Sequence, residues 1–123
     1  MTFTFTGLIA FTADVREAAK LYEEAFGLAR DWEDDHHVQF HLPTKGNAEG
    51  AWLLLHPATE ESHGQYLGYF AVDDVDAVAA RAQSAGFTIT QQPSDAPWGV
   101  REANLTDPDG NALTLNGPIA RVS

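Results

Sequence analysis

The sequence of 123 residues contains no cysteine, few basic side chains and no long apolar run. Without cysteine, a disulfide framework, a thiolate metal site and a cysteine nucleophile are all excluded, and a reducing compartment is compatible with the composition. No stretch of 18 apolar residues offers a membrane-spanning helix. The chain also opens without a basic segment followed by an apolar one, so we expect no secretory signal and a cytoplasmic location.

Basic residues are outnumbered, with 7 Lys and Arg against 18 Asp and Glu and a formal net charge of −11 at pH 7. This excess of negative charge repels nucleic acids and anionic lipids and favours cationic partners. We therefore expect no nucleic-acid partner, no membrane partner and a small-molecule ligand that carries positive charge. The plainer interpretation is an acidic surface that serves only solubility.

The most informative stretch is Asp-Pro-Asp-Gly-Asn at residues 107–111. Asp at the first position, Pro at the second and Gly at the fourth are typical of a type I turn. After this turn Leu113 and Leu115 alternate with more polar neighbours, as in a strand with one face in a core. The turn therefore joins two strands, and the second strand leaves one face free to line a site.

Turn and capping signals divide the chain into two similar halves. In the first, a strand at 7–12 precedes a helix that Asp14 caps and Gly27 ends, and three strands follow near 29–33, 36–42 and 51–56. In the second, a strand at 66–72 precedes a helix that Asp74 caps and Gly86 ends, and three strands follow at 87–91, 99–106 and 111–116. The sequence thus predicts an α+β fold with the order βαβββ used twice.

A shift of 60 residues superposes the two halves, placing Asp14 on Asp74, Gly50 on Gly110 and Leu53 on Leu113. The matches fall at a helix cap, a turn and the core face of a strand, so they indicate one structural unit used twice. We expect modules at 1–60 and 61–123. Neither is large enough to fold securely alone, so they should form one cooperative domain.

This combination resembles the vicinal oxygen chelate superfamily of glyoxalases, bleomycin-resistance proteins and extradiol dioxygenases. The resemblance rests on Tyr-Glu-Glu-Ala-Phe-Gly-Leu at 22–28, Phe-Ala-Val-Asp-Asp-Val at 70–75, Pro-Trp-Gly-Val-Arg at 97–101 and Asp-Pro-Asp-Gly-Asn at 107–111. It implies paired βαβββ modules that form a curved mixed sheet around a cavity, with the helices packed outside. It also implies a homodimer whose subunits pair or exchange modules.

The resemblance also locates the metal ligands of the superfamily, which are usually histidine, glutamine or glutamate. In this sequence those positions are Gly7, Leu54, Leu67 and Thr114. None of the four carries an imidazole or a carboxylate, the side chains that suit a catalytic divalent ion. We therefore predict no catalytic metal at the usual site and no cofactor, as in the metal-free bleomycin-resistance branch.

Strand alternation from these positions predicts an aromatic and apolar cavity wall. Its predicted members are Ile9, Phe11, Trp52, His56, Tyr69, Ala112, Thr114 and Asn116, with Trp98 at the rim. Phe11, Trp52, Tyr69 and Trp98 would stack on a flat ligand, and Glu102 and His56 would anchor it. The alternative for each aromatic ring is an ordinary place in the core.

Three functions remain open on this basis. The first is a metal-independent protein that sequesters a cationic or aromatic antibiotic or metabolite. The second is an enzyme of the same fold, namely a glyoxalase-like lyase, an isomerase or a thiol transferase, with a displaced metal held by His37, His41 or His56 and Glu102. His37, Gln39 and His41 would share a strand face, although such a face is more often polar surface. The third is a dimeric scaffold with a collapsed cavity.

Overall fold

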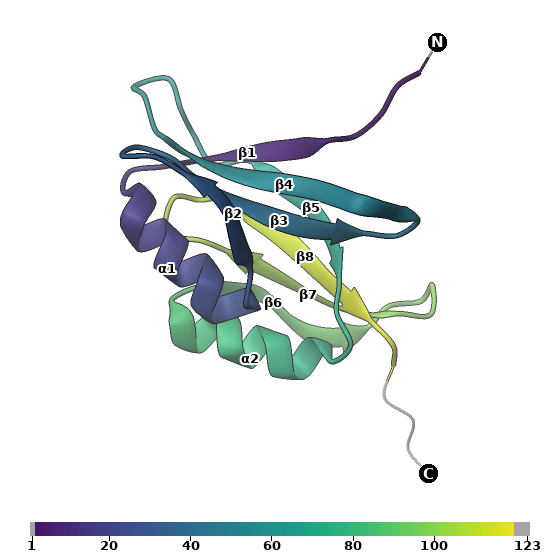
Figure 1. The fold of residues 1–123 in the computed structure, drawn as a ribbon. Coiled ribbons are helices and arrows are strands. Elements are labelled where there is room, and N and C mark those ends of the chain that lie inside the picture. The colour runs from purple at the N-terminus through teal and green to yellow at the C-terminus, as the bar shows by residue number, and fades with distance from the viewer. Residues whose placement is uncertain (1, 120–123) are drawn as a thin grey trace.

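A computed structural model describes residues 2–119, which form two helices and eight strands (Figure 1). The first module contains β1 (Gly7–Thr12), α1 (Val15–Phe26), β2 (Ala29–Glu33), β3 (Val38–Thr44) and β4 (Asn47–Pro57). The second contains β5 (Tyr66–Ala71), α2 (Val75–Ala85), β6 (Thr88–Asp95), β7 (Arg101–Thr106) and β8 (Ala112–Gly117). The predicted α+β class and the repeated βαβββ order are confirmed.

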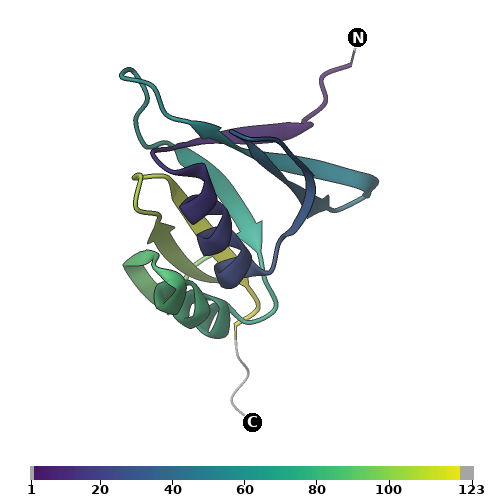
Figure 2. The same cartoon turned by 60° about the vertical axis from the view of Figure 1, so that its left-hand side comes forward.

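Each module forms its own four-stranded sheet, and the two sheets have the same topology. The strand orders are β1-β4-β3-β2 in the first sheet and β5-β8-β7-β6 in the second. In each, the first and last strands of the module pair in parallel and the remaining neighbours pair antiparallel. The helix makes the crossover that a parallel pair requires. Helices α1 and α2 pack against each other on one side of the molecule (Figures 1 and 2).

Both helices begin and end where the capping residues predict. The Asp14 side chain accepts a hydrogen bond from the Glu17 amide at 3.2 Å, and the Asp74 side chain accepts one from the Ala77 amide at 3.1 Å. These bonds satisfy amide groups that a helix N-terminus leaves without partners. At the other end of α1, Gly27 adopts the left-handed conformation with φ 65° that favours glycine.

Several strand ends differ from the prediction, each for a local reason. The third strand begins at Val38 rather than residue 36, because the Asp34 side chain accepts hydrogen bonds from the two amides of residues 36 and 37. The predicted loop at 43–47 is a tight hairpin, and β3 continues through Pro43 beyond the reach of β2. Strand β6 continues through Pro93 because it is an edge strand, where a missing N–H is tolerated.

A β-bulge in β5 changes which side chains share a face with Thr114. Tyr66 pairs with Ala112, but Gly68 pairs with Leu113 and Tyr69 pairs with Thr114, so Leu67 is an extra residue in the ladder. The expectation that Leu67 lies on the same face as Thr114 is therefore wrong. Leu67 borders a cavity between the modules instead.

The two modules are held together by the turn that joins β7 and β8. The Asp107 carboxylate is buried and accepts hydrogen bonds from the Asn111 amide at 2.9 Å and from the Tyr22 hydroxyl of α1 at 2.7 Å. The Asn111 side chain donates to the Phe11 carbonyl at 3.0 Å, and the Asp109 side chain accepts from the amide of the residue before Asp14 at 2.9 Å. The turn of the second module is therefore hydrogen-bonded to α1 and to the residues just before it in the first module.

Removing the Tyr22 hydroxyl tests this attachment. Tyr22→Phe leaves a buried carboxylate with one donor fewer, and we expect it to lower the free energy of unfolding by about 1–3 kcal/mol. The measurement is urea denaturation followed by circular dichroism. An unchanged midpoint would contradict the role given to this hydrogen bond.

The same variant should alter the dependence of stability on pH. Burial, followed by the charge of Asp107, raises the pKa of Tyr22 well above its ordinary value. The unfolded chain then loses this proton first, so the stability from Tyr22 is complete below about pH 10 and falls as pH rises toward the folded pKa. Denaturation between pH 8 and 11 should show a steeper fall for the wild type than for Tyr22→Phe.

Candidate functional site

The face of the first sheet that points away from α1, here called the first open face, carries three of the predicted ligand-binding residues. Along β4 the buried side chains are Ala51, Leu53 and Leu55, so Trp52, Leu54 and His56 point the other way. Strand β1 pairs in register with β4, and this places Phe11 beside His56 with ring centroids 5.3 Å apart. Phe11, Trp52 and His56 are therefore brought together on one partly exposed surface.

Trp52 occupies the space beside Gly7 at one end of this face. A Cβ atom at Gly7 would overlap the carbons of the Trp52 indole, so only glycine leaves room for the ring in this position. Gly7 is the residue at which the superfamily resemblance places a metal ligand. Here the indole lies where such a side chain would extend.

His56 has partners that the sequence did not reveal. Its Nδ1 lies 2.8 Å from the Pro57 carbonyl oxygen, which only accepts, so Nδ1 carries the proton and Nε2 is left available. The ring of His37 packs edge-on against His56 with centroids 4.8 Å apart, and the Nδ1 of His37 lies 2.9 Å from Asp34 Oδ1. The two imidazoles form a pair whose orientation is fixed by Asp34 and by the Pro57 carbonyl.

The second open face, on the side of the second sheet away from α2, carries Tyr69, Trp98 and Glu102. The Glu102 carboxylate accepts hydrogen bonds from the Tyr69 hydroxyl and, at 3.2 Å, from the indole Nε1 of Trp98. The hydrogen bond to Glu102 raises the pKa of Tyr69, so the phenol stays neutral. Both rings are exposed, Tyr69 to 53% and Trp98 to 69%, and are available to a ligand.

Thr114 supports this surface and does not present a free hydroxyl to it. Its Oγ1 accepts a hydrogen bond from Tyr66 at 2.7 Å and donates one to Asn104 Oδ1 at 2.7 Å. The side chain is 7% exposed. Thr114 therefore positions Tyr66, a residue that sequence alternation missed because the bulge in β5 brings it onto this face.

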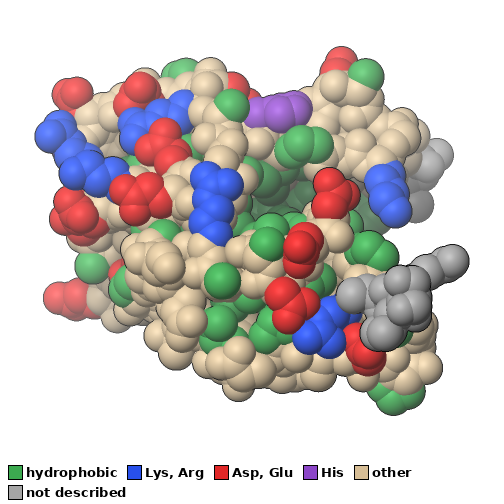
Figure 3. Space-filling view, turned by 90° about the horizontal axis from the view of Figure 1, so that it is seen from below, with side chains coloured by type: hydrophobic (Ala, Val, Ile, Leu, Met, Phe, Trp, Pro, Cys, Tyr) green, Lys and Arg blue, Asp and Glu red, His purple; other side chains and the backbone are tan. Residues whose placement is uncertain are grey.

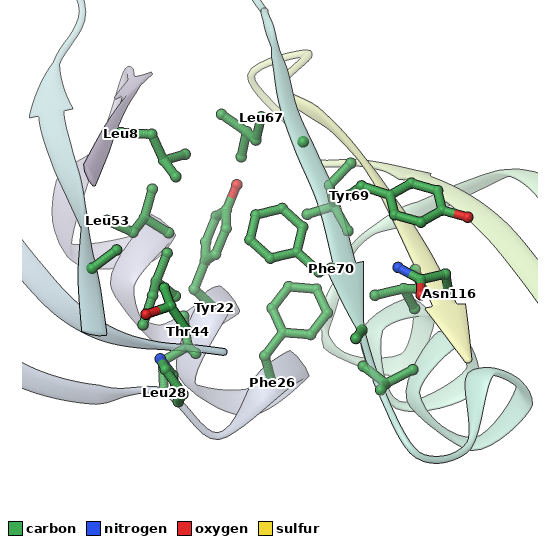
Figure 4. Close-up of a pocket in the computed structure, with 18 of the residues that line it drawn as sticks. Leu8, Tyr22, Phe26, Leu28, Thr44, Leu53, Leu67, Tyr69, Phe70 and Asn116 are labelled. Atoms are coloured by element: carbon green, nitrogen blue, oxygen red, sulfur yellow. The ribbon is translucent and has the colours of Figure 1, made fainter. Parts of the chain in front are cut away.

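The two open faces do not enclose one cavity within a single chain. A cavity of about 710 Å³ lies between the modules instead, and its walls come from the opposite sides of the sheets (Figure 4). The rings of Tyr22, Phe26 and Phe70 gather there, whereas the Tyr69 hydroxyl points away from them. Of the residues predicted for the cavity wall, Tyr69 and Asn116 border this cavity. From below, hydrophobic side chains line a hollow in the molecular surface (Figure 3).

The residues present do not fit the divalent ion that the superfamily resemblance implies. Among residues 2–119, no three His, Asp or Glu side chains lie together in a group that could hold a metal. The displaced set considered from the sequence is also divided. His37 and His56 touch, but His41 pairs with Trp52 farther along the sheet, and Glu102 lies on the second open face.

Within the described part of the chain, no helix is both long and apolar enough to cross a membrane.

The architecture of two βαβββ modules defines this chain as a paired-module α+β protein. Comparison with known families then gives the family directly. The chain belongs to the Glyoxalase/Bleomycin resistance protein/Dioxygenase superfamily, whose family model matches residues 5–115.

Solved structures share this fold at low sequence identity. A glyoxalase-related enzyme from Fulvimarina pelagi is 17% identical with a TM-score of 0.79, covering 95% of this chain and 92% of its own. A superfamily member from Sphaerobacter thermophilus is 21% identical with a TM-score of 0.74, covering 94% of this chain and 98% of its own. At these identities the likeness supports the fold alone.

The curated relatives match over a shorter segment. Putative glyoxylase CFP32 of Mycobacterium bovis and of Mycobacterium tuberculosis is 46% identical over 50 residues, which are 41% of this chain. The matched segment is only 19% of the length of those relatives.

The contact between Gly7 and Trp52 gives a test of the first open face. Gly7→Ala should displace the indole, shift the tryptophan fluorescence and lower the free energy of unfolding by about 1–3 kcal/mol through overpacking. In the background of Trp52→Leu, Gly7→Ala should lower the free energy of unfolding by clearly less, because the smaller side chain leaves room for the added methyl group. Equal costs in both backgrounds, measured as a double-mutant cycle by denaturation, would contradict the contact.

Proposed function

We propose that this protein binds, without a metal ion, a small organic molecule that carries positive charge or aromatic rings, as a bleomycin-resistance protein sequesters its antibiotic. The observation that carries the proposal is the Glu102 carboxylate held between the exposed rings of Tyr69 and Trp98. Exposed aromatic side chains around a few oriented polar groups are typical of ligand sites. The lack of ligand side chains at Gly7, Leu54 and Thr114 supports metal independence.

The proposal includes a homodimer that completes the site. Each open face is at least partly exposed in the single chain, and the first carries three and the second four of the seven predicted ligand-binding residues. A second copy that lays its second open face over the first open face would bring Phe11, Trp52 and His56 opposite Tyr69, Trp98 and Glu102. This arrangement would cover apolar surface on both subunits. The proposed cellular location remains the cytoplasm.

Catalysis by a glyoxalase-like lyase, an isomerase or a thiol transferase is the second candidate. It is favoured by the His37–His56 pair, because each imidazole has its Nδ1 engaged and can present Nε2 to a proton or a ligand. A displaced metal in this candidate would need a further ligand beside these two nitrogens. Activity that requires added nickel, zinc or manganese would favour it over sequestration.

The direct test of the binding proposal is a fluorescence titration of chelator-treated protein with a bleomycin-type glycopeptide. We expect saturable quenching that weakens as salt is raised, since exposed charges are screened. Trp98→Phe and Trp52→Phe should each lose part of the response, because both rings belong to the proposed site. Glu49→Gln, at an exposed carboxylate of β4 outside the site, should retain the whole response. Absence of quenching in the wild-type protein at both salt concentrations would refute the proposal for this class of ligand.

The proposed dimer is tested separately by sedimentation. We expect the wild-type chain to sediment at twice the mass of one chain. Leu54→Arg, which places a charge in the middle of the first open face, should shift the equilibrium toward the monomer by at least tenfold, about 1.4 kcal/mol. The matched control is Glu49→Arg at the exposed start of β4, which should leave association unchanged. A monomeric wild type would overturn the shared-site geometry.

A further inference from the structure

The second open face concentrates exposed aromatic surface to an unusual degree. Tyr66, Tyr69 and Trp98 are exposed to 61%, 53% and 69%, and they are three of the seven large hydrophobic side chains exposed on the described residues. All three lie on one surface with Glu102, and we call these four residues the aromatic–carboxylate cluster. Leaving so much aromatic surface in water favours a role in binding.

Hydrogen bonds hold the members of this cluster in place before any ligand arrives. Glu102 accepts from the Tyr69 hydroxyl and from the Trp98 indole, so each ring is tied by its polar atom to the same carboxylate. The Tyr66 hydroxyl is tied to Thr114, which is itself bonded to Asn104. Because the polar edges are engaged, the ring faces are left as the available surface, and little conformational freedom remains to be lost on binding.

The cluster carries one uncompensated negative charge. Across residues 2–119, Glu102 takes part in no ion pair with a basic side chain. Its neighbour in sequence, Arg101, is engaged by Asp76 at 2.6 Å and Asp95 at 2.9 Å. A carboxylate without a cation, surrounded by ring faces of negative electrostatic potential, favours a positively charged ligand.

We infer that the aromatic–carboxylate cluster binds an alkylated ammonium group of the ligand. Small inorganic cations are strongly hydrated, and this site offers them one carboxylate and few other oxygen ligands. An alkylated ammonium ion is weakly hydrated, packs its methyl or methylene groups on aromatic faces and keeps its charge near Glu102. This inference rests on the proposed function, and it assigns the cationic end of the ligand to the second open face. The aromatic end then falls to Phe11 and Trp52 on the first.

The test is a titration of the protein with tetramethylammonium chloride, followed through the Trp98 indole N–H resonance and fluorescence. Trp98→Phe identifies the signal. We expect a saturable change that potassium chloride at equal ionic strength does not produce. Glu102→Gln keeps an oxygen acceptor for both rings but removes the charge, and it should weaken binding about tenfold, or ~1.4 kcal/mol. Glu49→Gln, an exposed carboxylate outside the cluster, is the matched control and should bind as the wild type does.

Two results would overturn the inference: an equal response to potassium chloride, or unchanged affinity in Glu102→Gln with a native circular dichroism spectrum. If Glu102→Gln is not folded, Tyr66→Leu supplies a second test, because it removes a ring face and leaves the carboxylate in place. Unchanged affinity in folded Tyr66→Leu would overturn the inference as well. Quenching by the glycopeptide without binding of tetramethylammonium would reject the ammonium site and leave the proposed function standing. Binding of tetramethylammonium without quenching by the glycopeptide would support the ammonium site and reject sequestration of that glycopeptide.

Discussion

The buried Asp107 carboxylate is the interaction on which the arrangement of the modules depends. It accepts hydrogen bonds within its own turn and from Tyr22 in the other module, so one charged group fixes both the β7–β8 connection and the docking of α1. Burying a charge is costly unless its oxygens are satisfied, and here both are. The turn therefore fixes how the two open faces are directed, although it lies on neither of them.

Sequence reasoning predicted the local structure well where one residue determines one outcome. Asp14 and Asp74 cap the helices, Gly27 ends α1, and the alternation of Trp52, Leu54 and His56 places them on one face. These features depend on short-range hydrogen bonds and on the period of a strand. The family assignment followed from their order, and the family model confirms it.

The features that the sequence did not reveal depend on contacts between distant residues or on irregular backbone. The bulge at Leu67 shifts Tyr66 onto the face of Thr114, and simple alternation has no means to signal it. The partner of His56 is His37, which reaches it through pairing of two strands. Nor could spacing along the chain show that the two open faces do not enclose one cavity within a single chain.

The packing of Trp52 against Gly7 constrains how this chain could evolve. A metal-binding side chain at residue 7 would overlap the Trp52 indole, and loss of the indole alone would leave the space beside Gly7 unfilled. We therefore expect the two positions to be epistatic, because a metal-binding side chain at residue 7 would require a change at Trp52 as well.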